Sequence, residues 1–511
     1  MNPLPEAGVN FPLEGGRRAT TGTGKRICAD AVRGLDDALA ARILAEPDWR
    51  HRYPEHLGDL ALVEARSAEA ALDVARAGMR SAHEQFVVVT DSGDVPLDAI
   101  GPAAGTLGTA EVAGSGERQR ELTVPYRGRL LQGDELLRQL ADWVRRGITE
   151  PSFGEAVGAV VRHPDWLDVS DRCFAVLGAG AQMGPFSQLL SWGARVAAVD
   201  LPRAGTWQRL IAQARSSAGT MLVPTRDGTT DSDERLAEVA GADLITQVAD
   251  LEAWLATVPG PLTLGNYGYV DGAGFVRLSM AFDALFTRLA GRRDDLSLAY
   301  LATPSDVFLV PREAVRMAEQ RYRRRSPAIL AAKAVYRASG SRYLRPNYTG
   351  GSTPEAGDFA LVNAIIPAQG PNYAVAKRLQ RWRMLLARAD GLLTSVHVAP
   401  PTRTRSVHSN PLMEERQRLT ELIGIETFDA ETSQALAAAI LVHDLRNPEA
   451  PANPATRLVH PHQIFMHAAN PGGRWRVPLE PASSLEPLRV VSRMRERLPF
   501  RGDGRRGDDS D

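Results

Sequence analysis

A glycine-rich turn between two apolar runs is the feature that most constrains what this chain can fold into. The turn carries Gly178, Gly180 and Gly184, and the second apolar run, 196–199, ends at Asp200. This order is typical of a strand, a phosphate-cradling loop, a helix and a second strand. The first glycine would permit the tight turn, the second would let backbone approach a pyrophosphate, and the third would let helix and strand pack closely.

The position of Asp200 indicates which ligand the turn would hold. A carboxylate about 20 residues beyond the glycines can accept hydrogen bonds from an adenosine ribose. Its charge would repel a 2′-phosphate, which favours NAD, although Arg203 is close enough to accommodate NADP if the loop bends. Gln182 and Met183 lie inside the turn and are expected to contact the same cofactor. The sequence therefore predicts an adenine dinucleotide site.

Strand-like and helix-like segments continue to alternate after Asp200, which predicts an α/β fold. We expect a doubly wound, mostly parallel Rossmann-type sheet with helices on both faces. The expected later strands are 220–224, 242–247, 261–265, 358–366 and 393–398, and the expected helices are 207–217, 251–258 and 373–389.

The length of 511 residues is too great for one ordinary core, so several domains are expected. The predicted organisation is a disordered leader (1–30), an N-terminal α+β domain (31–165), a nucleotide-binding and catalytic domain (166–284 and 358–480), a basic helical insertion (285–357) and a disordered tail (497–511).

Composition excludes several classes of protein. A formal net charge of −1 gives no global field for nucleic acid or an acidic membrane. No apolar run approaches the roughly 18 residues of a membrane span. The chain has only two cysteines, Cys28 and Cys173, so we do not expect disulfide bonds to stabilise it. This low cysteine content favours a reducing, cytoplasmic compartment. The sequence is compatible with a homo-oligomer and does not specify one.

The candidate catalytic pair is Tyr373 and Lys377. Four-residue spacing places phenol and ammonium on one face of the expected helix. Only three of the 60 basic residues are lysines, so each lysine raises a question about chemistry that arginine cannot perform. The ammonium is expected to lower the phenol's pKa, so that the pair could deliver a proton to a carbonyl oxygen. An ordinary surface Tyr–Lys neighbour pair is the alternative.

The region from about residue 172 to residue 407 resembles a divergent short-chain dehydrogenase/reductase. The resemblance implies that Tyr373 is the proton donor and that Lys377 assists at the ribose. It also implies that the exit of the last strand, with Pro400 and Thr402, lies at the nicotinamide. The glycine spacing departs from the family, and the dozen residues before Tyr373 contain no serine to orient substrate. Asn363, our first choice, and also Gln369 or Asn372, are expected to orient substrate instead.

Other functions remain open alongside this one. The glycine turn and Asp200 also resemble the first motifs of S-adenosylmethionine-dependent methyltransferases, although the acidic residue usual before the first glycine is Val176 here. A third hypothesis is a regulatory protein that binds a nucleotide and has no catalytic activity. The expected ligand in the leading reading is a small molecule, and no nucleic acid or membrane partner is expected.

Three further sequence features lie outside the motifs described above. Ten basic residues between 312 and 345 predict either a solvated helix face or a rim for a phosphate-bearing substrate, a coenzyme A ester or an acyl-carrier thioester. Three histidines at 460–467 lack a completing carboxylate or cysteine nearby, so a metal is not expected there. Arg474 and Trp475 are interpreted as packing and capping residues.

Overall fold

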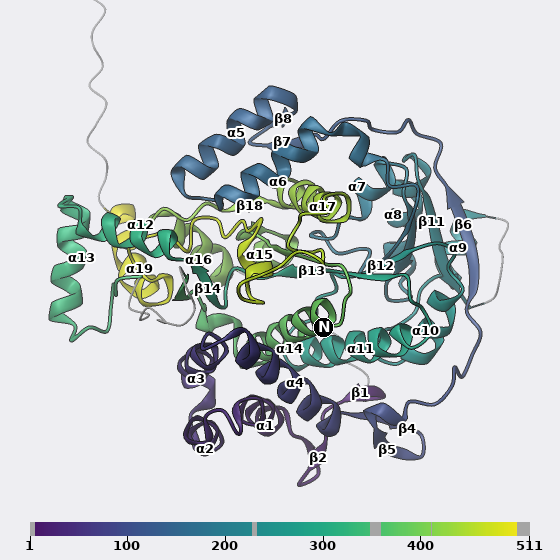
Figure 1. The fold of residues 1–511 in the computed structure, drawn as a ribbon, viewed down its shortest axis with the longest axis horizontal. Helices are drawn as coiled ribbons and strands as arrows, with labels where there is room; N and C mark the ends of the chain where they lie inside the picture. The colour runs from purple at the N-terminus through teal and green to yellow at the C-terminus, as the bar shows by residue number, and fades with distance from the viewer. Residues whose placement is uncertain (1–5, 227–231, 348–358, 410, 498–511) are drawn as a thin grey trace, which may run out of the picture.

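The structure, a computed structural model, describes residues 6–226, 232–347, 359–409 and 411–497. A seven-stranded sheet lies at its centre, and six of its strands are parallel (Figure 1). The order across the sheet is β16 (Thr394–Val398), β13 (Leu296–Ala302), β12 (Leu262–Asn266), β9 (Cys173–Leu177), β10 (Arg195–Val199), β11 (Thr220–Thr225) and β6 (Gly108–Ala113). Only β6 is antiparallel to its neighbour. The expected α/β fold with a mostly parallel sheet is therefore confirmed.

The parallel strands follow the chain in an order that reverses once. The chain moves outward from β9 through β10 to β11, returns to place β12 on the other side of β9, and continues outward to β13 and β16. Phe174 and Val176 face one apolar core, whereas Ala175 and Leu177 face the other. Strands buried on both faces read as continuous apolar runs, which is why the sequence revealed most of them.

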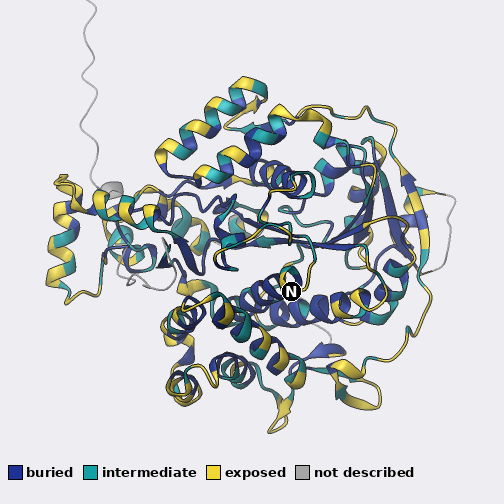
Figure 2. Cartoon of the chain, in the orientation of Figure 1, coloured by how far each residue is buried: buried dark blue, intermediate teal, exposed yellow. Residues whose placement is uncertain are grey.

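Helices cover both faces of the sheet. One face carries α11 (Ala273–Ala290) and α14 (Pro371–Ala389), which pack against each other and are largely buried (Figures 1 and 2). The opposite core includes α7 (Phe186–Ser191), α8 (Ala204–Arg215) and α17 (Ala430–Arg446). No helix in the described ranges has both the length and the apolar character needed to cross a bilayer.

The first hundred residues differ from their prediction. Instead of a disordered leader, β1 (Gly8–Asn10) pairs with β4 (Val87–Thr90), and α1 (Thr20–Val32) buries Ile27 and Cys28. The predicted N-terminal α+β domain is not separate either, because α1 and α4 (Ala68–Gln85) pack against α14 and β6 completes the central sheet. Residues 1–5 of the predicted leader lie outside the described residues, as does 498–511 of the predicted tail.

Two expected strands are not strands of the central sheet. Residues 242–247 form turns, because the Asp243 carboxylate accepts a hydrogen bond from the Ile245 amide and the Ile245 carbonyl accepts one from Val9. The segment 358–366 contains β15 (Phe359–Asn363), which pairs antiparallel with β14 (Val307–Pro311) in a sheet of its own.

The predicted basic insertion begins too early in the chain. Residues 285–357 include the end of α11 and the whole of β13, which is a central strand. The basic residues lie instead on α12 (Arg312–Arg323), on α13 (Pro327–Ala338) and in the segments that follow these two helices. These helices lie at one end of the molecule, near α16 (Pro411–Glu421) and α19 (Pro481–Arg497), and α13 is mostly exposed (Figures 1 and 2).

Candidate functional site

The glycine-rich turn follows β9 at the point where the strand order reverses. Gly178 has a φ of +85°, which favours glycine, and its amide donates to the Val199 carbonyl at 2.8 Å. A Cβ at this position would lie 2.6 Å from the backbone of Gly268, which follows β12. Gly178 is therefore required both by the turn and by the close approach of the neighbouring chain segment.

Asp200 lies beside this turn at the carboxyl end of β10. Its Oδ2 accepts a hydrogen bond from the Gly180 amide and its Oδ1 accepts one from the Leu201 amide, both at 2.8 Å. Burial raises the pKa of the carboxyl, while these two amides and Arg203 oppose the increase. A carboxylate oxygen can accept more than one hydrogen bond, so Asp200 keeps acceptor capacity for a ligand.

Four further residues expected at the cofactor belong to the turn or follow Asp200 closely in the chain. The Gln182 side chain accepts a hydrogen bond from the Arg405 amide at 2.6 Å, and the Gly184 carbonyl accepts one from Gln434. Met183 is half-buried and Arg203 is exposed. The helix α7 starts only at Phe186 and is six residues long, so the loop before it is longer than the sequence pattern suggested.

Tyr373 lies in the first turn of α14, the helix that precedes β16. Its phenol lies within the influence of the Thr303 and Gln369 side chains, both of which favour the ionised form, and its ring stacks on Phe275 with centroids 5.5 Å apart. Burial raises the pKa of the phenol to about 12, against the lowering effect of Thr303, Arg474 and Gln369. The expected lowering of this pKa by Lys377 is thus not found, because desolvation dominates.

Lys377 follows one helical turn later and points at the end of β13. Its Nζ donates to the Leu301 carbonyl at 2.9 Å and lies 4.9 Å from the centre of the Tyr300 ring and 5.3 Å from that of Phe275. Burial lowers the pKa of the ammonium to about 7, and Asp306 only partly opposes this change. The group can therefore gain or lose a proton near neutral pH.

Two residues near Tyr373 were missed by sequence reasoning. Thr303 directly follows β13. The sequence analysis placed the residues of β13 in the basic insertion, so it did not predict that Thr303 lies at the edge of the central sheet. Arg474, interpreted as a packing residue, exerts its charge on the Tyr373 phenol from a loop near the C-terminus. The Arg-Trp dipeptide carries no spacing signal that could have revealed this proximity.

Three expected site residues have their polar groups engaged elsewhere. Asn363 donates to the Pro54 carbonyl at 3.4 Å and accepts from the Ile365 amide, so it braces the end of β15 against α3 (Trp49–Glu64). Thr402 donates to the Pro400 carbonyl at 2.9 Å and shares a 2.7 Å hydrogen bond with Ser433 of α17. Pro400 is buried. Within the described residues, the hydrogen bonds of these three residues go to groups other than Tyr373.

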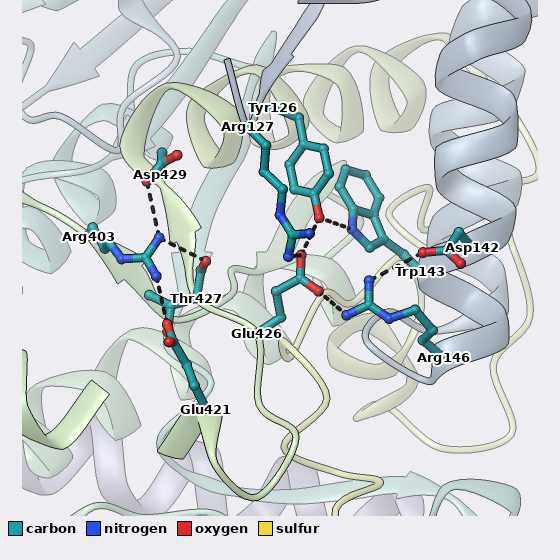
Figure 3. A network of polar contacts seen from close by, with 10 residues as sticks. All are labelled: Tyr126, Arg127, Asp142, Trp143, Arg146, Arg403, Glu421, Glu426, Thr427 and Asp429. Carbon is teal, nitrogen blue, oxygen red and sulfur yellow. Dashed lines mark hydrogen bonds and ion pairs between the residues drawn. The ribbon is translucent and has the colours of Figure 1, made fainter. Parts of the chain in front are cut away.

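A separate polar pocket of about 290 Å³ lies between α5 (Gly133–Arg146) and the short strand β18 (Phe428–Asp429) (Figure 3). Its centre is the buried carboxylate of Glu426, which accepts from Tyr126 at 2.6 Å and pairs with Arg146. On the other side, Arg403 pairs with Glu421 and Asp429. Because these arginines already have carboxylate partners, the pocket is best understood as a brace between segments.

Comparisons with known proteins give no assignment. No family model matches the chain, and no curated protein matches it either. Within the described residues, no group of three histidine, cysteine, aspartate or glutamate side chains could hold a metal ion.

Proposed function

We propose that this protein is an NAD(P)-dependent oxidoreductase that acts on a carbonyl/alcohol pair and has a Rossmann-type core similar to that of the short-chain dehydrogenases/reductases. The observation that carries the proposal is the position of α14. This helix bears Tyr373 and Lys377 and precedes the sixth parallel strand, and Thr303, which follows the fifth, is close enough to Tyr373 to favour the ionised form of its phenol. A hydroxyl thus lies where the sequence offered no serine.

The strand order supports a dinucleotide as the cofactor. Numbered along the chain, the six parallel strands from β11 to β16 lie in the order 3-2-1-4-5-6, which is the order of the doubly wound dinucleotide-binding sheet. Such sheets bind ligands outside the carboxyl ends of the strands where the order reverses, which here is between β9 and β12. Asp200 would accept the adenosine ribose hydroxyls, and the turn at 178–184 would face the diphosphate. The nicotinamide, when bound, supplies or accepts hydride.

The side chains of the site suit proton transfer in the direction of reduction. With a pKa of about 12, Tyr373 is protonated at neutral pH and can donate its proton to the carbonyl oxygen of a substrate. Thr303 and the positive charge of Arg474 favour the phenolate that remains. Lys377, with a pKa of about 7, can hold the proton that restores the phenol.

Ligand binding tests the proposal first. The thermal midpoint of the full chain should rise with NADH or NADPH and stay unchanged with S-adenosylmethionine, because only a ligand of the native state stabilises it. A rise with S-adenosylmethionine alone would favour the methyltransferase and overturn the oxidoreductase.

Substitutions then test the catalytic pair. On any carbonyl compound that is reduced, Tyr373→Phe should lower kcat by about 100-fold or more, the usual contribution of a positioned acid. Lys377→Met should also impair turnover. The control is Tyr269→Phe, since Tyr269 lies near Tyr373, with ring centroids 6.3 Å apart, but its hydroxyl bonds Asp271. Turnover that survives both substitutions in the pair contradicts the assignment.

A further inference from the structure

Arg474 differs from the other buried arginines near the C-terminal half of the sheet. It is 5% exposed, and its Nε and Nη1 have no hydrogen-bond partner among the described residues. Arg476, two residues later, pairs with Glu150. Arg378 and Arg381 are balanced by Glu64 and Asp306, two cations against two anions. Arg474 is thus a buried cation that pairs with no carboxylate of the described residues.

The loop that carries Arg474 offers further unpaired donors. Asn470 is fully buried, and its Nδ2 has no partner although its Oδ1 accepts a hydrogen bond from Gly472. Trp475 is also fully buried, and its Nε1 is unpaired. Between residues 470 and 475, the unpaired buried side-chain atoms are all nitrogen donors. Buried donors without acceptors carry a large desolvation penalty, which an anionic ligand would remove.

The loop is held at the carboxyl end of β16 by backbone hydrogen bonds. The Asn470 amide donates to the Val398 carbonyl at 2.9 Å, and the Gly473 amide donates to Ile148 at 2.8 Å. Asn347 holds the Arg474 carbonyl from the opposite side at 2.8 Å. The backbone of the loop is therefore held in place, and the buried Arg474 guanidinium is near enough for its charge to act on the Tyr373 phenol.

We propose that Arg474 and Asn470 bind a carboxylate of the substrate beside Tyr373, so that the substrate is a small oxo acid and the product the corresponding hydroxy acid. This inference rests on the proposed oxidoreductase function. One uncompensated guanidinium matches a group with one negative charge, which favours a carboxylate over a doubly charged phosphate. Charge-assisted hydrogen bonds from an arginine would also orient the carbonyl relative to the phenol.

Matched acids and neutral analogues test this assignment. The probes are 2-oxobutanoate and 4-oxopentanoate, each compared with its primary amide, which keeps the carbonyl and removes the charge. Two quantities are measured with the full chain: the thermal midpoint at increasing probe concentration, and oxidation of NADH or NADPH. At least one acid should raise the midpoint and be reduced, while its amide does neither at the same concentration.

Variants then connect the charge to the residue. Arg474→Gln should raise the KM for the acid by about 10- to 100-fold, the range for hydrogen bonds to a charged group, and Arg474→Lys should restore part of the loss. Arg325→Gln, which removes an exposed arginine between α12 and α13, is the control and should change neither quantity. If Arg474→Gln does not fold, the comparison of acid with amide on the natural chain decides alone.

The outcomes separate this inference from the proposed function. The carboxylate site is overturned if each acid and its amide are bound and reduced equally well. It is also overturned if neither the acids nor the amides bind. Reduction of neutral ketones that is indifferent to Arg474→Gln leaves the oxidoreductase standing and overturns the inference. Protection by an acid that depends on Arg474, without any oxidation of NADH or NADPH, supports the anion site and contradicts the oxidoreductase.

Discussion

The amide of Gly180 donates a hydrogen bond of 2.8 Å to Oδ2 of Asp200, so the acidic residue at the end of β10 closes the glycine-rich turn after β9. A Cβ at position 180 would lie 3.1 Å from the same oxygen. The sequence motif therefore has a structural role before any ligand binds. Its glycine and its aspartate hold each other in place.

Asp200→Asn should weaken dinucleotide binding by about 10-fold or more. The amide side chain keeps one acceptor oxygen but must turn its NH₂ group toward one of the two backbone amides, and hydrogen bonds to charged groups are the stronger ones. Fluorescence titration with NADH measures the change. Asp250→Asn is the control, since Asp250 also accepts from two backbone amides, those of Ala104 and Gly105, at a different place. Equal losses in both variants would show a general effect on stability.

Thr303→Val should lower kcat on a reduced carbonyl compound, whereas Thr303→Ser should keep most of it. Valine has nearly the shape of threonine but lacks the hydroxyl that favours the ionised form of the Tyr373 phenol. An unpaired buried polar group costs about 1–3 kcal/mol, which corresponds to a loss of about 5- to 100-fold. Steady-state kinetics measures it, with the thermal midpoint as a check on folding. Identical rates for valine and serine would remove Thr303 from the site.

The stability of the protein should rise with pH between about 7 and 10.5 because of Lys377. In the folded chain the Lys377 ammonium has a pKa of about 7, whereas in the unfolded chain it has the ordinary lysine pKa of 10.5. In that window the unfolded state binds more protons, so raising the pH favours the folded state by at most about 1.4 kcal/mol per unit. Below pH 7, Lys377 is protonated in both states, so its contribution to the free energy of unfolding does not change with pH.

Urea unfolding of the natural chain and of Lys377→Met at several pH values isolates this effect. The difference in unfolding free energy between the two proteins should change above pH 7 and be constant below it. A constant difference over the whole range would contradict a depressed pKa at Lys377.

Glu64→Gln should destabilise the protein by about 3–5 kcal/mol, the usual effect of breaking a buried ion pair. Glu64 is fully buried and accepts from Arg378 at 2.8 Å and from the Trp382 indole at 2.7 Å. Urea unfolding measures the loss. Glu55→Gln on the same helix is the control, because Glu55 is exposed and its pair with Arg52 should contribute less than about 1 kcal/mol. Similar losses in the two variants would contradict the role assigned to the buried network.

Local patterns predicted those parts of the fold that depend on local sequence. The strands β9, β10, β11, β12 and β16 and the helix α14 were predicted, because apolar runs and helical periodicity are visible within a short window. The error at 242–247 has a long-range cause, since the partner of Ile245 is Val9, more than 200 residues away.

The candidate site was predicted less completely. Gly180 and Asp200, both predicted to contact a cofactor, are hydrogen-bonded to each other, and Tyr373 and Lys377 share a helix. Thr303 and Arg474 reach Tyr373 only because β13 and the loop after residue 469 are carried to the same sheet edge by tertiary folding. The expected effect of Lys377 on the pKa of Tyr373 was based on charge, whereas burial is the largest influence on the pKa values of both residues.

The ion pair between Glu64 and Arg378 joins residues 314 positions apart in the chain. During synthesis, α3 emerges from the ribosome long before α14, and until then Glu64 has no guanidinium to neutralise it. The helices of the first hundred residues can therefore reach their final packing only after most of the polypeptide has been translated. A nascent chain arrested before α14 would leave the surfaces of α1 and α4 that pack against α14 exposed to chaperones and proteases.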